Sequence, residues 1–348
     1  MGLAETLELP PLPDDLGRVE TSLAAAVRHP DRFLGDVAAH LVEAGGKRIR
    51  PTLTLCAAYA ATGGAAPAIE DAVTGAVAVE LVHLGSLYHD DVIDEAETRR
   101  GVPSVNARWS NIVAILAGDY LLARASSLAA SLGAPVAALL AATIGELCRG
   151  QVLELQHLFD VTRTEEDYAT AIEGKTATLF GTACRIGGMV SAAGEPTLDA
   201  LTRFGTHLGL GYQIVDDCLD LTGTDAELGK PVGQDLVEGI YTLPVIYALA
   251  EDPDLGPRLG APIDGDRLAE VRRRASANGA VDAALAVARD HATKAGEALA
   301  GADTLDPSVC DALRRLVEGL VTRQNCRARL RPRAVAPRPR RGSSAAPG

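Results

Sequence analysis

Apolar residues recur at helical spacing through most of this chain. Long segments carry apolar side chains every three or four positions and are separated by short stretches rich in Gly, Pro and Asp. No run of alternating β-branched residues is bounded by turn signals, so we predict an all-α fold. The first segment is interrupted near Pro30, where Asp31 can cap a new helix. The predicted helical segments are 16–44, 51–61, 67–94, 104–132, 135–159, 164–173, 175–193, 197–222, 242–251, 265–278, 281–300 and 307–323.

The two ends of the chain differ from its middle. Residues 1–15 are acidic and Pro-rich, with no basic segment followed by an apolar one, so we predict a disordered N-terminus and no signal peptide. Residues 326–348 contain seven Arg and no acid, and their Arg, Pro, Ala and Gly content predicts a disordered tail. Residues 16–325 are expected to form one helical catalytic domain.

Composition narrows the class of protein. Hydrophobic residues make up 47% of the 348 residues and aromatic residues only 3%, so Ala, Leu and Val supply most of the core, which favours packed helices. A net charge of −13 argues against nucleic acid as a partner. The six cysteines are far apart and form no C-x-x-C pair, as in reduced cytoplasmic proteins. No stretch of about 18 residues resembles a membrane span once its Gly, Ser and Asp are counted. We therefore expect a soluble cytoplasmic protein.

An acidic cluster, Asp90-Asp91-Val92-Ile93-Asp94, ends an otherwise apolar helical segment. Such a cluster is expected where cations neutralise it. Asp90 and Asp94 are four residues apart, so on a helix both carboxylates point to the same side. Hard oxygen ligands suit Mg²⁺, and the guanidinium groups of Arg99 and Arg100, which follow directly, suit phosphate. The pattern predicts a magnesium-diphosphate site.

A second cluster, Asp216-Asp217-Cys218-Leu219-Asp220, repeats the D-D-x-x-D spacing at the end of another apolar segment, 208–215. Either cluster alone could be a helix terminus or a solvated acidic patch. Two clusters with one spacing favour a shared site, in which facing carboxylates hold several Mg²⁺ ions around a phosphate ligand.

With these clusters the chain resembles the trans-type isoprenyl (polyprenyl) diphosphate synthases over about residues 30–325. The family fold is a bundle of antiparallel helices around a deep central cavity, usually in a homodimer. The resemblance rests on a set of motifs that occur in the family's order. They are Gly45-Gly46-Lys47-Arg48-Ile49-Arg50-Pro51, His83, Asp90-Asp91-Val92-Ile93-Asp94, Arg99-Arg100-Gly101, Gly174-Lys175-Thr176, Gln213 with Asp216-Asp217-Cys218-Leu219-Asp220, and Gly229-Lys230.

The resemblance implies a role for each matching residue. Two or three Mg²⁺ ions would be held by Asp90, Asp94 and Asp216, while Asp91, Asp217 and Asp220 would orient ligands or waters. The allylic diphosphate would be bound by Arg99, Lys175, Thr176 and Lys230, with Lys175 and Thr176 at a break in a helix, and Gln213 would also contact substrate. The isopentenyl diphosphate would be bound by Lys47, Arg50, His83 and Arg100.

Without the resemblance, these basic residues would be interpreted as surface charges and His83 as a core histidine. The residues expected to act in catalysis are Asp90, Asp94, Arg99, Lys175, Asp216 and Lys230.

One position departs from the family pattern, which often has a lysine between Gly239 and Tyr241 where this chain has Ile240. This puts one local diphosphate contact in doubt. The family chemistry ionises the allylic C–O bond, and the carbocation is then attacked by the double bond of isopentenyl diphosphate. A proton is then lost to the released diphosphate rather than to a side chain. Positioning and electrostatics supply the catalysis, so no protein nucleophile is required.

Product length is predicted from the helix that ends in the first cluster. Ser86 and Gly85 stand four and five residues before Asp90, and Val82 lies one turn further from it. None is aromatic, so we predict a product of roughly six to nine isoprene units, because each open helix turn is about 5.4 Å long.

Three alternatives stay open at this point. A class I terpene cyclase shares the first cluster but typically has a different second metal motif. A subunit of a heteromeric prenyl synthase would usually have lost its aspartates. The Arg-rich tail could make a weak contact with anionic lipid, or be a disordered terminus only.

Overall fold

A computed structural model describes residues 6–64, 66–224 and 232–328, with side chains up to residue 319. The described fold is all-α, as predicted, apart from a ribbon of two short antiparallel strands, β1 (Thr98–Arg99) and β2 (Val102–Pro103). The helices are α2 (Leu12–Ala26), α3 (Arg32–Glu43), α4 (Ile49–Thr62), α5 (Glu70–Ile93), α6 (Val105–Arg108), α7 (Asn111–Ser131), α8 (Ala134–Gln156), α9 (Glu165–Ile172), the π-helix η1 (Glu173–Ala177), α10 (Thr178–Val190), α11 (Glu195–Thr222), α13 (Gln234–Glu238), α14 (Leu243–Glu251), the 3₁₀-helix η2 (Gly256–Arg258), α15 (Gly265–Ala275), α16 (Ala280–Ala300) and α17 (Pro307–Ala328).

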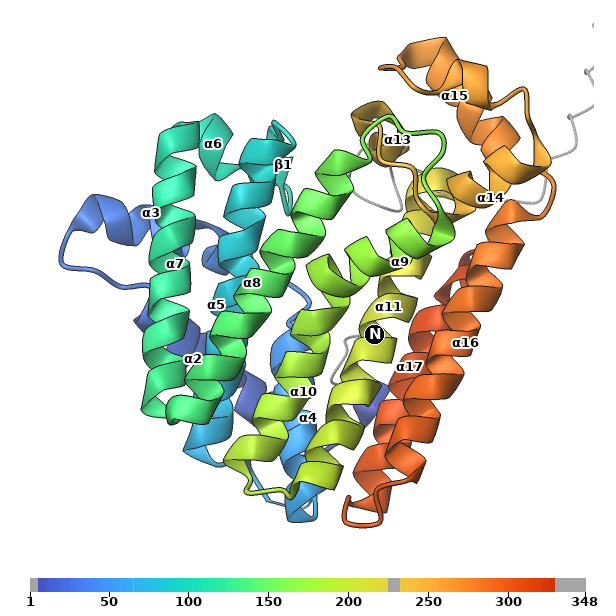
Figure 1. Cartoon of the computed structure of the whole chain (residues 1–348). Helices are drawn as coiled ribbons and strands as arrows, with labels where there is room; N and C mark the ends of the chain where they lie inside the picture. Colours follow the sequence, from blue (N-terminus) through green and yellow to red (C-terminus); the bar gives the residue numbers. More distant parts are fainter. Residues whose placement is uncertain (1–5, 65, 225–231, 329–348) are drawn as a thin grey trace, which may run out of the picture.

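The long helices form an antiparallel bundle (Figure 1). In it α5 packs against α4 and α7, and α10 packs against α4 and α11. Helix α16 lies along the other side of α11, with α17 beside it. The core between them consists mainly of Ala, Leu and Val side chains. Helices α5, α8 and α11 all end at the end of the bundle where β1 and α13 lie, so both aspartate clusters reach the same end (Figure 1).

Helix boundaries follow local capping chemistry. Asp31 caps α3, as predicted, because its Oδ1 accepts from the backbone N–H of Leu34 at 2.9 Å. The predicted single helix over 104–132 is wrong, because two serines each cap a new start. Ser104 caps the short α6 and Ser110 caps α7, where its hydroxyl oxygen accepts from the N–H of Val113 at 3.3 Å.

The prediction of a disordered N-terminus over 1–15 is wrong for the described residues from 6 onward. Leu7, Leu9 and Leu12 are buried in the core. Asp15 is buried in α2, where its Oδ2 accepts from the hydroxyl of Tyr59 at 2.6 Å and from the backbone N–H of Ala68 at 2.7 Å. The proline and acid content of this segment led to the prediction of disorder, whereas its three leucines pack on the bundle.

The last helix extends further than predicted, because α17 runs to Ala328 rather than ending near residue 323, so the prediction of a disordered tail is wrong for residues 326–328. The rest of the Arg-rich tail, residues 329–348, lies outside the described residues. The lipid contact suggested for the tail therefore stays a prediction.

Two helices, α7 and α8, are long and apolar enough to cross a membrane by length and composition. The expectation that no segment meets this criterion is wrong. In the most apolar window of each helix, 33% of the residues of α7 and 22% of those of α8 are buried inside the bundle. Both helices pack against each other, α7 also against α5 and α8 against α10. Core helices of soluble proteins meet the same criterion, so it does not show that α7 and α8 cross a membrane. Both helices nevertheless expose apolar side chains on the surface of the bundle.

Candidate active site

The first aspartate cluster occupies the last turn of α5. The backbone N–H of Asp94 donates to the carbonyl of Asp90 at 2.8 Å, which places their side chains one helical turn apart. Asp91 faces the other way and is buried. Its Oδ1 accepts from both Nε and Nη2 of Arg99, each at 2.6 Å. Asp91 therefore holds Arg99 at the edge of the cluster, on the first strand of the small ribbon.

The electrostatics of Asp90 show which other helices reach this cluster. Burial raises the pKa of Asp90 to about 6, and Asp94 and Glu154 add to the increase. Lys175 and Arg99 act in the opposite direction. Because Glu154 lies on α8 and Lys175 on η1, the site is built from three segments that are distant in sequence.

The second cluster ends α11 and is tied to its neighbours by hydrogen bonds. Asp217 is buried and accepts from the hydroxyl of Tyr168 at 2.6 Å and from Nε2 of Gln213 at 2.7 Å. Oε1 of Gln213 in turn accepts from the hydroxyl of Thr176 at 2.9 Å. Burial raises the pKa of Asp217 to about 7, with further contributions from Asp216 and Glu154. Asp217 is thus an anchored carboxyl group rather than an open ligand.

The other members of this cluster differ in exposure. Asp216 is exposed at the end of α11, as a metal ligand requires. Asp220 is buried, and its Oδ2 accepts from the backbone N–H of Asp235 at 3.3 Å. Asp216 is thus the accessible carboxylate of this cluster, and its role as a metal ligand stays a prediction.

Lys175 lies on the π-helix η1, which interrupts the α-helical pattern at the predicted position, although the chain stays helical from α9 through α10. A side chain on Gly150 would collide with the backbone of Lys175 at 2.2 Å, which means that α8 and η1 can approach only through glycine. This contact brings Glu154 to Lys175, and the two form an ion pair. Burial lowers the pKa of Lys175, but Glu154 and Asp90 outweigh this effect and raise it overall.

A group of basic side chains lies on the His83 side of α5. Arg48 is buried and pairs with Glu80, with 2.9 Å between Nη1 and Oε1. Arg100 donates to the carbonyl oxygens of Leu41 and Gly45. Burial lowers the pKa of His83 well below its usual value, and the surrounding arginines lower it further. His83 is therefore neutral at physiological pH.

Arg50 and Lys47 complete this basic group. The guanidinium of Arg50 lies 4.7 Å from the centre of the Phe180 ring, and its Nε has no hydrogen-bond partner among the described residues. Lys47 is exposed in the connection between α3 and α4. Arg48, Arg50 and Arg100 all lower the pKa of His83. Glu80 is the buried acid beside them, so we expect this group to attract an anion.

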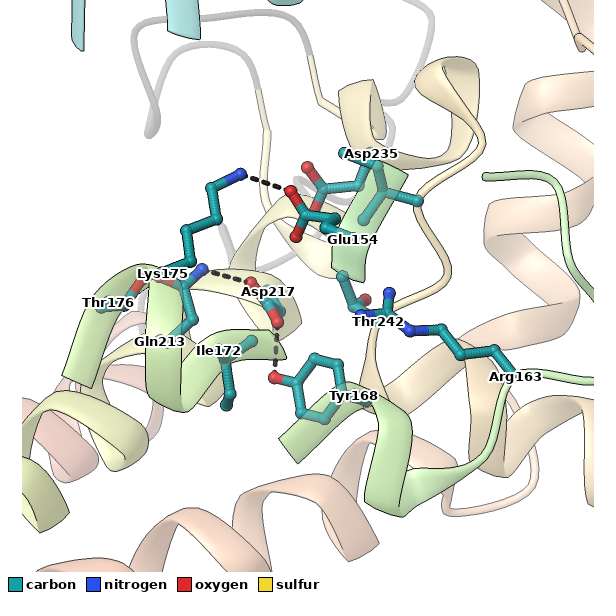
Figure 2. Close-up of a pocket in the computed structure, with 11 residues that line it drawn as sticks. Glu154, Arg163, Tyr168, Ile172, Lys175, Thr176, Gln213, Asp217, Asp235 and Thr242 are labelled. Carbon is teal, nitrogen blue, oxygen red and sulfur yellow. Dashed lines mark hydrogen bonds and ion pairs between the residues drawn. The ribbon is translucent and has the colours of Figure 1, made fainter. Parts of the chain in front are cut away.

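A cavity of about 70 Å³ lies between α8, η1 and α11. Figure 2 shows Lys175 and Arg163 reaching it from opposite sides, with Glu154 and Asp217 between them. Ile240 also lines the cavity, so the position where the resemblance expects a lysine supplies no charge there. The predicted Lys230 lies outside the described residues.

Several residues of this site escaped the sequence analysis. Glu80 stood as a single acid inside an apolar run three residues before His83, which was a usable signal. Glu154, Arg163 and Tyr168 gave no such signal, because only the packing of α8 and α9 brings them to the second cluster.

A metal ion would need ligands from more than the protein side chains. In residues 6–64, 66–224 and 232–328, no group of three or more His, Cys, Asp or Glu side chains is placed to hold a metal. The carboxylates present are nevertheless hard oxygen donors that suit Mg²⁺, which commonly keeps waters and takes substrate phosphates as further ligands. The donor chemistry therefore fits Mg²⁺ bound together with a diphosphate.

The residues expected to set product length fall into two groups. Val82 is buried, and Ser86 is half-buried with its hydroxyl bonded to the carbonyl of His83 at 2.9 Å. Gly85 instead packs against α7, where an added Cβ would lie 3.1 Å from the carbonyl oxygen of Gly118 and 3.2 Å from Leu122. Gly85 therefore lies at a close contact with α7, and its role in setting product length stays a prediction.

Comparison with known proteins agrees with this site. The polyprenyl synthetase family model matches residues 31–274. The chain is 45% identical over 242 residues to heptaprenyl diphosphate synthase component 2 of Geobacillus stearothermophilus, covering 69% of this chain and 74% of that protein. It is 44% identical over 261 residues to nonaprenyl diphosphate synthase of Mycobacterium tuberculosis, covering 74% and 76%.

A solved structure is similar over most of the fold. This is the polyprenyl synthase of Caulobacter crescentus CB15, in complex with calcium and isoprenyl diphosphate. It has a TM-score of 0.85 and 31% identity and covers 92% of this chain and 98% of that one. The chain belongs to the polyprenyl synthetase family, whose members are prenyltransferases. The predicted family and enzyme class are confirmed, and the family implies dependence on a divalent metal.

Proposed function

We propose that this protein condenses isopentenyl diphosphate with an allylic diphosphate to make a medium-to-long-chain all-trans polyprenyl diphosphate. The observation that carries the proposal is the meeting of both aspartate clusters, through Asp90 and Asp217, around the Lys175–Glu154 pair. Relatives named for seven-unit and nine-unit products support the medium-to-long-chain assignment.

In this proposal two or three Mg²⁺ ions are held by Asp90, Asp94 and Asp216 together with the allylic diphosphate. When bound, they supply positive charge that stabilises the departing diphosphate. Asp91 keeps Arg99 aimed at the same group, and Asp217 and Asp220 keep the end of α11 in place. Lys175 exchanges its bond with Glu154 for the diphosphate, and Thr176 fixes Gln213.

The second substrate occupies the basic group on the His83 side of α5. Lys47, Arg50 and Arg100 bind its diphosphate, and neutral His83 donates a hydrogen bond without adding charge. Holding the double bond beside the allylic carbon is the main contribution of this half of the site. The proton lost after condensation passes to the released diphosphate.

The experiment is an assay of the purified protein with Mg²⁺, labelled isopentenyl diphosphate and each allylic starter, followed by chromatography of the dephosphorylated products. We expect products of six to nine isoprene units. Short products from every starter would contradict the assignment of product class. Ser86→Phe should shorten the product, because Ser86 is half-buried one turn from Asp90. Gly85→Phe is its control for packing and should mainly lower thermal stability.

The quaternary arrangement in this proposal is a homodimer that buries the apolar surface of α7 and α8. Ile112 and Leu116 on α7 are 71% and 60% exposed, and Ile115 is also exposed. Val152 and Leu155 continue this surface on α8. Exposed apolar patches of this kind mark association surfaces. Light scattering of the wild type and of Leu116→Lys would test it, with a monomeric variant expected.

A second candidate is a two-component enzyme, because one relative carries the name component 2. The chain would then be the subunit that holds both aspartate clusters. Product formation by the purified chain alone would remove this candidate. We also propose a cytoplasmic location, because the cysteines are far apart in the sequence and the five described cysteines are all free thiols.

A further inference from the structure

Arg163 is a buried cation beside the second aspartate cluster that no motif identified. It lies in the connection between α8 and α9, and the residue is 4% exposed. Its Nη1 donates to the carbonyl oxygen of Tyr241 at 3.1 Å. Its Nε and Nη2 are buried as well, and neither has a hydrogen-bond partner among the described residues. Buried donors are nearly always satisfied, so these two nitrogens point to a ligand.

The carboxylates nearest to Arg163 are already engaged elsewhere. Glu154 pairs with Lys175, and Asp217 accepts from Tyr168 and Gln213. Within the part of the chain that the structure describes, no salt bridge links Arg163 to an acid. Figure 2 shows its guanidinium extending from the α8–α9 connection towards Glu154 and Thr242, at the side of the cavity opposite Lys175.

The orientation of the guanidinium is fixed from two directions. The bond to Tyr241 holds Nη1, and the ring of Tyr168 lies 5.6 Å from the central carbon. The free edge is the one formed by Nε and Nη2, whose two N–H groups are parallel. This edge matches two oxygens of one phosphate group.

The size of the cavity limits what can bind there. Its volume of about 70 Å³ and its mostly charged and polar lining suit a phosphate group better than an isoprenoid chain. Glu154 and Asp217 would repel an anion alone, so the ligand must bring cations with it. A diphosphate carrying Mg²⁺ has this chemistry.

We propose that Arg163 is a further binding residue of this site and holds a phosphate group of a diphosphate through its Nε–Nη2 edge. The inference rests on the proposed function, which supplies two sources of that group. One is the diphosphate of the allylic substrate, and the other is the inorganic diphosphate released from it.

The test compares Arg163→Gln and Arg163→Lys with Arg149→Gln, a matched control at an exposed arginine of α8 that pairs with Glu146. The KM for each substrate is measured, together with the shift in melting temperature caused by Mg²⁺ and inorganic diphosphate. Both Arg163 variants should raise the KM for the allylic substrate or weaken diphosphate binding by about tenfold to hundredfold, the range for loss of hydrogen bonds to a charged group. The KM for isopentenyl diphosphate and all properties of the control should stay unchanged.

The outcomes separate the two sources and the competing structural role. A raised allylic KM with an unchanged thermal shift assigns the contact to the substrate, and the reverse assigns it to the released diphosphate. Wild-type values for both measurements in Arg163→Gln overturn the proposal. So does full recovery in Arg163→Lys, since charge alone would then suffice, or an equal rise in both KM values, which marks a general structural defect. A wild-type enzyme that binds diphosphate but converts no starter would instead contradict the proposed function.

Discussion

The two sides of the candidate site satisfy their charges in different ways. On the His83 side, Arg48 is paired with Glu80 and Glu20, and Arg100 is held by carbonyl oxygens. Beside the second cluster, Lys175 is held by a carboxylate that lines the cavity, and two buried nitrogens of Arg163 have no hydrogen-bond partner among the described residues. In the proposed function, the first side therefore binds an anion without a metal, whereas the second side is completed by a diphosphate and its cations.

This difference has an electrostatic origin. The His83 side contains one buried acid among several arginines, which keep their charge at any physiological pH. The other side contains Asp90, Glu154 and Asp217 close together, and burial raises the pKa of Asp90 to about 6 and of Asp217 to about 7. Carboxylates with raised pKa values gain most from an added divalent cation. The chemistry of bond cleavage is expected on this second side.

The largest effect should follow loss of a metal-binding carboxylate. Asp90→Asn and Asp216→Asn should each lower kcat/KM by about 10³-fold, because developing charge on the leaving diphosphate is then poorly stabilised. Asp199→Asn, at the exposed opposite end of α11, is the control and should behave as wild type. Steady-state kinetics at saturating Mg²⁺ measure the effect, and wild-type rates in both variants would remove the metal assignment.

On the His83 side, the main effect should be on stability and on one substrate. Glu80 is 2% exposed, and Glu80→Gln leaves Arg48 without its buried partner, which should destabilise the protein by about 3 kcal/mol. The KM for isopentenyl diphosphate should rise while the KM for the allylic substrate stays constant. Denaturant unfolding and kinetics measure both, with Glu146→Gln at an exposed ion pair as the control. A selective rise in the allylic KM would contradict the division into two sides.

The carboxylates beside the second cluster should make the Mg²⁺ affinity of the protein depend on pH. A raised pKa means that Asp90 becomes protonated as the pH falls through about 6, and Mg²⁺ must then compete with that proton. Mg²⁺ affinity of the free protein should be constant above pH 7 and about tenfold weaker at pH 5. Calorimetric titration measures it. An affinity that stays level from pH 5 to 8 would show that these carboxylates do not bind the ion.

The smallest effect should come from the hydrogen-bond chain behind Asp217. Thr176→Val keeps the shape of the side chain but removes the donor to Gln213, which itself donates to Asp217. Loss of one neutral hydrogen bond of about 1 kcal/mol should lower kcat/KM by about fivefold. Thr170→Val, at an exposed threonine of α9, is the control. A loss as large as that of Asp216→Asn would place Thr176 on the substrate itself.

Much of this site could be predicted from local sequence. Asp90 and Asp94 share a face because they are four residues apart at the end of one helix. Asp31 caps α3 because its side chain reaches the backbone N–H of Leu34, three residues further on. The interruption of the α-helical pattern at Lys175 was likewise foreseeable from the glycine before it. Each of these features depends on residues within one or two turns of each other, where helix geometry alone determines the outcome.

The features that local sequence could not predict all involve segments distant in the chain. The sequence shows that Gly85 is small, but not that it packs closely against α7. Leu7 and Leu9 looked like part of a disordered terminus, yet they pack on the core. In both cases the burial of a residue depends on which helix packs against it, and the periodicity of the sequence does not identify that helix.

The sequence by itself determined the class of the fold, the family and the positions of the two aspartate clusters, because periodicity and short motifs are local. The tertiary structure alone decided what surrounds them. The approach of α8 to η1 through Gly150 pairs Glu154 with Lys175, and the α8–α9 connection carries Arg163 to the second cluster. Burial then changes the pKa values of Asp90 and Asp217 and leaves two guanidinium nitrogens of Arg163 without a hydrogen-bond partner among the described residues. These properties arise only when separate helices exclude water from the same space.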